Sequence, residues 1–183
     1  MRRMNSVNRI RMIAVASTVA VLLAVSAFLT VPSPIPFTMQ TFVLFLSLFV
    51  FGGKITLCAV IVYISIGAVG LPVFSGGGAG VGVIFGERGG FVIGFALAAL
   101  VYWGLDSAFR HLKMKKIIAA ISGMVTVYLS GMVWFAFVTE GGSGGFLGVF
   151  IVAVLPFLIP DILKIVLAYF ISFRIEKVIH RIL

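Results

Sequence analysis

Residues 37–71 read FTMQTFVLFLSLFVFGGKITLCAVIVYISIGAVGL, two apolar runs that are interrupted only by Gly52-Gly53-Lys54. A membrane-spanning helix needs roughly 20 predominantly apolar residues, and each run approaches that length. The stretch therefore predicts two consecutive spans, over about residues 37–51 and 55–71, in an integral membrane protein.

The composition of the whole chain supports this class. Of its 183 residues, 62% are hydrophobic and 10% are charged, and the mean hydropathy is +1.26. A soluble domain is about half apolar and about a quarter charged. These values exclude a soluble enzyme, a disordered tail and a secreted disulfide scaffold, and the one cysteine, Cys58, forms no internal disulfide.

Apolar patterning predicts an all-α protein with six transmembrane helices in a single domain, residues 1–183. The last apolar run, residues 146–173, would be about 42 Å long as one helix, too long for a core of about 30 Å. We therefore expect a half-helix or membrane-embedded turn to Leu155 and the main sixth helix from about Pro160. The other predicted spans are about residues 12–31, 37–51, 55–71, 91–109 and 117–138.

The distribution of positive charge tests this count of spans. The chain has 14 Lys and Arg against 5 Asp and Glu, a net charge of +9. In a membrane protein such an excess orients the chain, because cationic loops stay in the cytoplasm; it does not indicate nucleic-acid binding. Six spans place both termini on the cytoplasmic side, together with twelve of the fourteen cations: Arg2, Arg3, Arg9, Arg11, Lys54, Arg110, Lys113, Lys115, Lys116, Arg174, Lys177 and Arg181.

The two remaining cations are candidate site residues. Lys164 lies within the last apolar run together with Asp161, three residues earlier and on the same helix face. Ionisable groups inside a span face a cavity or a partner and are functional by default. Pro160 before Asp161 predicts a helix start, where the helix dipole favours a carboxylate. The alternative is a purely structural ion pair.

The second cation, Arg88, belongs to a glycine-rich segment, Pro72–Gly90, between the third and fourth predicted spans. The topology places this segment outside the cell. Its apolar residues predict that it folds back as a lid, with Arg88 available to an anionic ligand or paired with Glu87. The sequence contains no G-x-x-x-x-G-K-[ST] phosphate loop, and no cluster has metal-ligand spacing.

Two further features have structural interpretations. Ala16, Ala20 and Ala24 recur every four residues on the first span, a spacing that lets helices approach closely in lipid. Tyr128 and Trp134 fit interfacial belt residues, and Trp134 alternatively fits a cavity wall.

Four stretches together resemble the BioY family. They are PIPFTMQT at residues 34–41, GLPVF at 70–74, GERGGF at 86–91 and PFLIPDILK at 156–164. BioY proteins are the biotin-binding S components of energy-coupling factor (ECF) vitamin transporters. The resemblance implies capture of biotin outside the plasma membrane of a bacterium or archaeon. It also implies association with a transmembrane T component and two ABC-type ATPases, with the alanine stripe on the first helix meeting the T component.

The resemblance implies a binding site and no catalytic one. Biotin has a carboxylate tail, an apolar thiophane ring and a ureido group with two N–H donors, so its site needs a cation, an apolar wall and an acceptor. We expect Lys164 and Arg88 to recognise the carboxylate and Asp161 to order Lys164 or accept from the ureido group. Gln40, Thr38 and Gly77 are further expected contacts, and no metal or cofactor is expected.

Three other functions remain open on the residues alone. One is an S component for a different small vitamin. Another is a small membrane enzyme that uses Asp161 and Lys164 as an acid–base pair, although no nucleophile accompanies them. A structural subunit or channel is the third, and a single intramembrane charge pair argues against a conducting pore.

Overall fold

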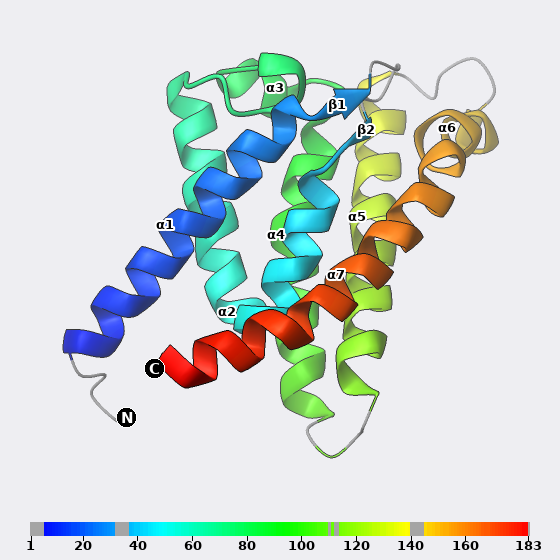
Figure 1. Ribbon diagram of the computed structural model, residues 1–183. Coiled ribbons are helices and arrows are strands. Elements are labelled where there is room, and N and C mark those ends of the chain that lie inside the picture. Colours follow the sequence, from blue (N-terminus) through cyan, green and yellow to red (C-terminus); the bar gives the residue numbers. More distant parts are fainter. Residues whose placement is uncertain (1–5, 32–36, 110, 112–113, 140–144, 183) are drawn as a thin grey trace.

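A computed structural model describes residues 6–31, 37–109, 111, 114–139 and 145–182 of the protein (Figure 1). Within them, five helices are long and apolar enough to cross a membrane. These are α1 (Ser6–Phe28), α2 (Gln40–Val69), α4 (Gly89–Ala108), α5 (Lys115–Val138) and α7 (Leu155–Ile182). The shorter elements are β1 (Thr30–Val31), β2 (Phe37–Thr38), the 3-10 helix η1 (Ser75–Gly77), α3 (Val81–Phe85) and α6 (Gly145–Ala153).

Helix α2 consists of two arms that reverse direction at Gly52, where the predicted interruption lies. Gly52 has a left-handed, non-helical backbone (φ 76°, ψ 170°), which glycine adopts without a steric penalty. Ser47 Oγ donates to Thr56 Oγ1 at 3.1 Å, whereas nine residues of straight helix span about 13 Å. Gln40 Nε2 likewise donates to Tyr63 OH at 2.6 Å. The arms therefore lie side by side, as the cyan and teal ribbons show in Figure 1.

Helices α4 and α5 lie close together where α4 carries small residues. A Cβ atom at Gly94 would lie 2.4 Å from Ser130 Oγ, and one at Gly90 would lie 2.2 Å from the Cβ of Trp134. Ala98 continues this four-residue spacing and is fully buried. Small residues allow helix backbones to pack closely in lipid, so this stripe holds α4 against α5.

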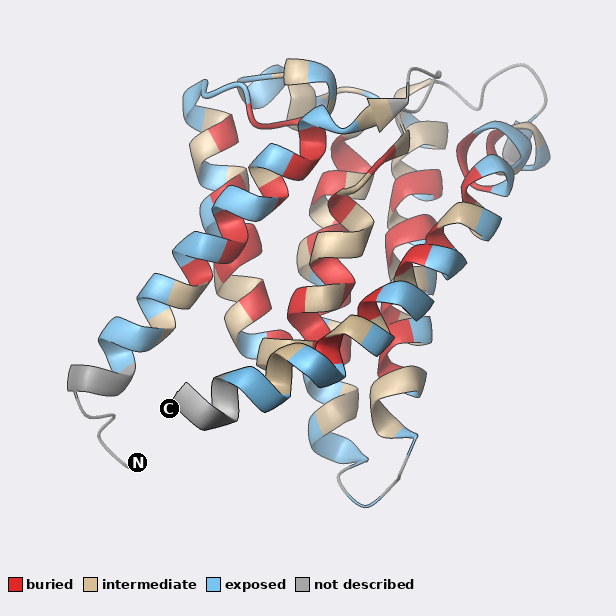
Figure 2. Ribbon diagram, in the orientation of Figure 1, coloured by how far each residue is buried: buried red, intermediate tan, exposed pale blue. Residues whose placement is uncertain are grey.

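The alanine stripe of α1, predicted as a surface for a partner helix, packs largely within the molecule. Ala16 and Ala20 are 5% and 1% exposed, and Ala24 packs against the same core. The reason is that α1 packs its small side chains against α2. The opposite face of α1 exposes large apolar residues such as Ile13, Val21 and Val25. Figure 2 shows this division between inward and outward faces in several of the helices.

The last apolar run bends earlier than predicted. Helix α6 ends at Ala153 and α7 begins at Leu155, so Pro160 lies inside α7 and does not start it. Proline has no N–H to donate to the carbonyl of residue 156, so α7 continues through Pro160 with one backbone hydrogen bond fewer. Asp161 consequently lies in the second turn of α7, and the predicted N-terminal position for its carboxylate is wrong.

The segment between α2 and α4, residues 70–88, is here named the lid segment. It contains η1 and α3 and lies at the end of the bundle where the β1–β2 ribbon is found (Figure 1). The Phe74 ring is buried, 5.5 Å from the ring of Tyr63 in an edge-to-face arrangement. It also covers Gly67, where a Cβ would meet the ring at 2.2 Å. The predicted apolar fold-back is thus an ordered, packed segment.

Lys116 joins three elements at the opposite end of the bundle. Its ammonium group donates to the carbonyl oxygen of Phe49 at 3.2 Å and forms an ion pair with Glu176 on α7. Phe49 lies near the end of the first α2 arm, where carbonyl groups lack helical partners and attract cations. Of the cations assigned to this end, Arg2, Arg3, Arg110 and Lys113 lie outside the described residues.

Candidate functional site

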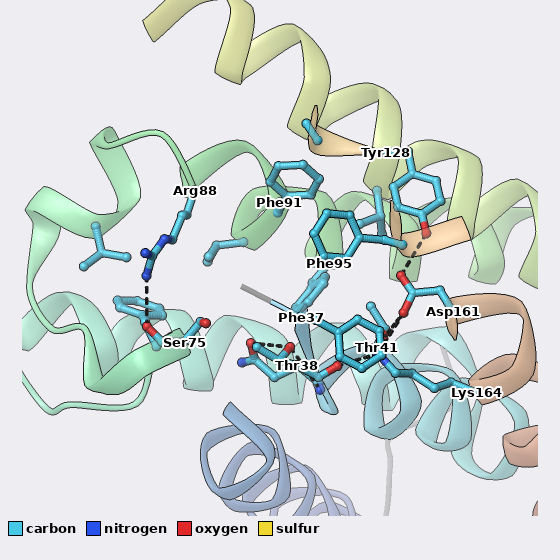
Figure 3. A pocket seen from close by; sticks show the side chains of 17 residues that line it. Phe37, Thr38, Thr41, Ser75, Arg88, Phe91, Phe95, Tyr128, Asp161 and Lys164 are labelled. Atoms are coloured by element: carbon cyan, nitrogen blue, oxygen red, sulfur yellow. Dashed lines mark hydrogen bonds and ion pairs between the residues drawn. The ribbon is translucent and has the colours of Figure 1, made fainter. Parts of the chain in front are cut away.

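A cavity lies beneath the lid segment, and each long helix except α1 contributes to its wall (Figure 3). Polar groups lie at its two ends, and aromatic rings of Phe37, Phe91 and Phe95 lie between them. Such an arrangement fits an elongated molecule with an apolar middle and polar ends. The lining residues are Phe37, Thr38, Gln40, Thr41, Phe74, Ser75, Val83, Arg88, Phe91, Val92, Phe95, Val127, Tyr128, Ala153, Phe157, Asp161 and Lys164.

One end of the cavity contains the predicted pair on α7. Lys164 and Asp161 are each 6% exposed and form an ion pair at 2.9 Å. Lys164 Nζ also donates to the carbonyl oxygen of Thr38 at 2.5 Å and to Thr41 Oγ1 at 3.1 Å. An ammonium group has three donors, so these three acceptors occupy all of them.

Asp161 is held by three donors but retains capacity to accept. Its Oδ1 accepts from Lys164 and, at 2.8 Å, from Thr41 Oγ1, whereas its Oδ2 accepts from the hydroxyl of Tyr128 at 2.8 Å. A carboxylate has about four acceptor positions. One position on Oδ2 therefore remains for a donor in the cavity.

Thr38 and Gln40 support this end of the cavity. Thr38 Oγ1 lies 3.3 Å from Gln40 Oε1, and Gln40 Nε2 donates to Tyr63 OH at 2.6 Å and to the Leu23 carbonyl at 3.4 Å. These bonds join α1 to both arms of α2. Both N–H donors of the Gln40 amide are used. Gln40 therefore holds the first turn of α2 in place against α1 and the second arm.

The Lys164 ammonium group also lies over an aromatic face. Its Nζ is 3.6 Å from the centroid of the Phe37 ring, a distance at which the ring quadrupole attracts a cation. The Phe37 ring stacks on that of Phe157 at 6.3 Å. The buried charge is thus stabilised by a carboxylate, two further oxygens and a ring.

Arg88 occupies the other end of the cavity. Its Nη1 donates to the carbonyl oxygen of Ser75 at 3.2 Å, which connects the start of α4 to η1. Glu87 is exposed, and within the described ranges Arg88 forms no ion pair. The alternative of an Arg88–Glu87 pair is therefore wrong. A guanidinium group has five N–H donors, so Arg88 has donors left for an anion.

Similarity to known proteins identifies the family of this chain. The model of the BioY family matches residues 1–181. The chain belongs to the BioY family. Its relatives include a probable biotin transporter BioY of Pyrococcus horikoshii, 35% identical over 144 residues that cover 78% of this chain and 82% of the relative. The biotin transporter BioY of Thermotoga maritima is 34% identical over 161 residues, 85% of this chain and 90% of that protein.

The BioY fold is also found among solved structures. The S component for biotin from an ECF-type ABC transporter, solved by crystallography, superposes with a TM-score of 0.84 at 20% sequence identity. The match covers 96% of this chain and 95% of that one. At this identity the similarity shows that the two chains share a fold.

Five of the six predicted substrate contacts of this BioY chain line the same cavity. Asp161, Lys164, Arg88, Gln40 and Thr38 all line the cavity, whereas Gly77 does not. Gly77 has a positive φ of 76° and contributes to the turn of the lid segment; its contact with substrate stays a prediction.

Sequence reasoning missed or misread several residues at this BioY site. Tyr128 is 8% exposed and bonded to Asp161, so it is a site residue and does not belong to an interfacial belt. Trp134 is absent from the cavity lining; its Nε1 donates to the Gly86 carbonyl at 2.9 Å and so holds the lid segment on α5. Thr41 and Ser75 are uncharged and belong to no catalytic or metal-binding motif, so the sequence did not single them out. Thr41 is, however, the last residue of the family motif PIPFTMQT.

Proposed function

We propose that this protein is the biotin-specific S component of an ECF-type ABC transporter and captures biotin at the outer face of a bacterial or archaeal plasma membrane. The family, the names of its relatives and the shared fold support a role in biotin transport. The observation that carries the proposal is the two-ended cavity, with the Arg88 guanidinium at one end and the buried Asp161 carboxylate at the other.

The polar groups at the two ends of the cavity favour one orientation of biotin in the proposed binding mode. Its ureido group lies against Asp161, where the vacant acceptor position of Oδ2 takes one N–H. Its thiophane ring lies between the aromatic rings of the middle, and its carboxylate reaches Arg88. Lys164 is unsuited to the carboxylate because its three donors are already engaged. This assignment revises the expectation that Lys164 and Arg88 share the carboxylate.

The proposed topology has six spans and cytoplasmic termini. Counting the two arms of α2 separately gives this number, and the turn at Gly52 supports doing so. Arg9, Arg11, Lys54 and the basic residues of α5 and late α7 would then face the cytoplasm, as the positive-inside rule requires. The lid segment would lie outside, where substrate is captured.

Energy would come from partner subunits, namely a transmembrane T component and two ABC-type ATPases. The chain has no phosphate-loop sequence of its own. We propose that it acts as a binding subunit and not as an enzyme, and that it uses no metal or cofactor.

The direct test is to identify the ligand. The protein is purified in detergent, denatured, and the released small molecules are analysed by mass spectrometry; we expect biotin. A panel of radiolabelled vitamins then measures selectivity. Preferential retention of another vitamin would make the chain an S component for that compound, and conversion of a compound would support an enzyme.

Site variants connect the ligand to the cavity. We expect Asp161→Asn and Arg88→Ala to reduce biotin retention at least tenfold, since each removes one polar end. Lys177→Ala, an exposed cation on α7 outside the cavity, serves as the control. Wild-type retention by both site variants would contradict the assignment.

A further inference from the structure

The side chain of Ser75 is an exception among the buried polar groups. Its hydroxyl oxygen is buried, yet within the described residues it has no hydrogen-bond partner, the one such side-chain atom found there. A buried hydroxyl without a partner is unfavourable, and such groups in native proteins commonly mark a ligand or a bound water.

Ser75 lies beside Arg88, the cation at this end of the cavity. The residue belongs to the cavity wall, and its carbonyl oxygen already accepts from Arg88 Nη1. Figure 3 shows Ser75 and Arg88 together at the end of the cavity away from Asp161 and Lys164. A hydroxyl donor and a guanidinium with spare donors thus border the same space.

The backbone around Ser75 brings these groups close. Gly76 and Gly77 follow with φ values of 71° and 76°, a conformation that L side chains rarely adopt. A Cβ at Gly76 would lie 3.8 Å from Arg88 Nη1. The turn therefore passes directly against the guanidinium group and sets the serine beside it.

We infer that Ser75 Oγ is a ligand-binding donor that, with Arg88, selects a free carboxylate on the transported molecule. The inference rests on the proposed function and adds a specificity residue to it. One carboxylate oxygen accepts from the Ser75 hydroxyl and the other from Arg88. A neutral amide has one oxygen in place of two and carries no charge, so it forms weaker bonds to Arg88 and Ser75 than the charge-assisted bonds of a carboxylate.

The pair also connects recognition to the lid. Ser75 belongs to η1 within the lid segment, whereas Arg88 directly precedes α4. An anion held by both therefore ties the lid segment to the bundle in addition to the existing Arg88–Ser75 bond.

The test compares biotin with biotinamide, which differs only at the carboxyl group, on wild type, Ser75→Ala and the matched control Ser65→Ala. Ser65 is exposed on α2, and its hydroxyl bonds within its own helix. Dissociation constants are measured by titration calorimetry in detergent. We expect Ser75→Ala to weaken biotin about tenfold and biotinamide by a smaller factor, because a hydrogen bond to a charged group is the stronger one. Selectivity between the two ligands therefore falls.

Thermal unfolding of the ligand-free protein provides a second measurement. Because Ser75 Oγ has no partner there, Ser75→Ala should unfold at or above the wild-type temperature. Wild-type affinity for biotin in Ser75→Ala, or equal weakening of both ligands, would overturn this inference alone. Failure of the wild type to bind biotin would overturn the proposed function and the inference with it.

Discussion

At the scale of single residues, Lys164 and Asp161 show how a membrane interior retains two charges. Each group bonds to the other and to neutral oxygens, and the lysine also lies over the Phe37 ring. A buried pair often contributes little net stability, but removal of one partner leaves an uncompensated charge. The pair is therefore better explained by the site that it builds than by stability.

Single and double replacement of this pair separates stability from binding. Lys164→Met leaves the buried Asp161 carboxylate without its cation, and we expect the free energy of unfolding to fall by about 3 kcal/mol. Asp161→Asn/Lys164→Met should recover most of that loss but still fail to retain biotin. Thermal unfolding and biotin retention are measured in parallel, with Lys177→Met as control. Recovery of retention in the double variant would contradict a role in the site.

Removal of the Tyr128 hydroxyl tests the Asp161 end of the cavity without removing a charge. Tyr128→Phe removes the donor to Asp161 Oδ2, which disturbs the acceptor that we assign to the ureido group. We expect biotin affinity to fall about tenfold, the usual scale for a hydrogen bond to a charged group. Tyr102→Phe, another buried tyrosine but outside the cavity lining, should bind as wild type does.

At the scale of elements, small residues decide how closely helices pack. The α1 alanines were predicted as a partner surface, yet they lie against α2, whereas Gly90, Gly94 and Ala98 seat α4 on α5. The four-residue spacing of alanines indicated a close-packing stripe on α1, but it did not indicate which helix covers that stripe. The partner of a stripe depends on the tertiary arrangement, which the local pattern does not contain.

Gly94→Ala tests this contact. The added methyl would lie 2.4 Å from Ser130 Oγ and 3.2 Å from the Cα of Val127, so α4 and α5 must separate slightly. Overpacking of this kind typically costs about 1–3 kcal/mol. Gly104→Ala on the same helix has open space around it and should unfold like wild type or slightly later, because alanine favours helices. Equal stability of the two variants would contradict the claim that Gly94 is needed for close packing of α4 on α5.

The packing of the lid segment can be tested in the same way. Gly67→Ala would push its methyl group into the Phe74 ring at 2.2 Å and so loosen the segment from α2. We expect biotin to dissociate about tenfold faster, equivalent to about 1.4 kcal/mol, while unfolding changes less. Gly82→Ala, within α3 and free of close neighbours, is the control. Unchanged dissociation in Gly67→Ala would show that Phe74 does not retain the ligand.

At the scale of the whole molecule, the sequence predicted the helices and the break at Gly52 well. Apolar run lengths and the Gly-Gly-Lys interruption carry that information locally. The start of α7 was misplaced by five residues, because Pro160 is tolerated within the early turns. For the cavity, charge inside a span identified Asp161 and Lys164, and Arg88 was identified as the cation of the predicted outer segment. Uncharged members such as Tyr128 and Ser75 depend on elements far apart in sequence and had no local signal.

Cysteine accessibility tests the proposed orientation of the whole chain. In a Cys58→Ala background, Glu87→Cys in the lid segment and Lys54→Cys at the turn of α2 each supply one exposed thiol. A membrane-impermeant maleimide should label the first in intact cells and the second only after permeabilisation. Labelling of both from the same side would contradict six spans.

The anchor formed by Lys116 has a mechanical consequence. Glu176, which it holds, lies fifteen residues beyond Asp161 on one helix, α7, a distance of about 22 Å along the axis. Helix α7 thus connects the charged end of the cavity directly to the point where Lys116 joins it to α5 and the first arm of α2. Any displacement of α7 as a rigid rod would move both ends of this connection together.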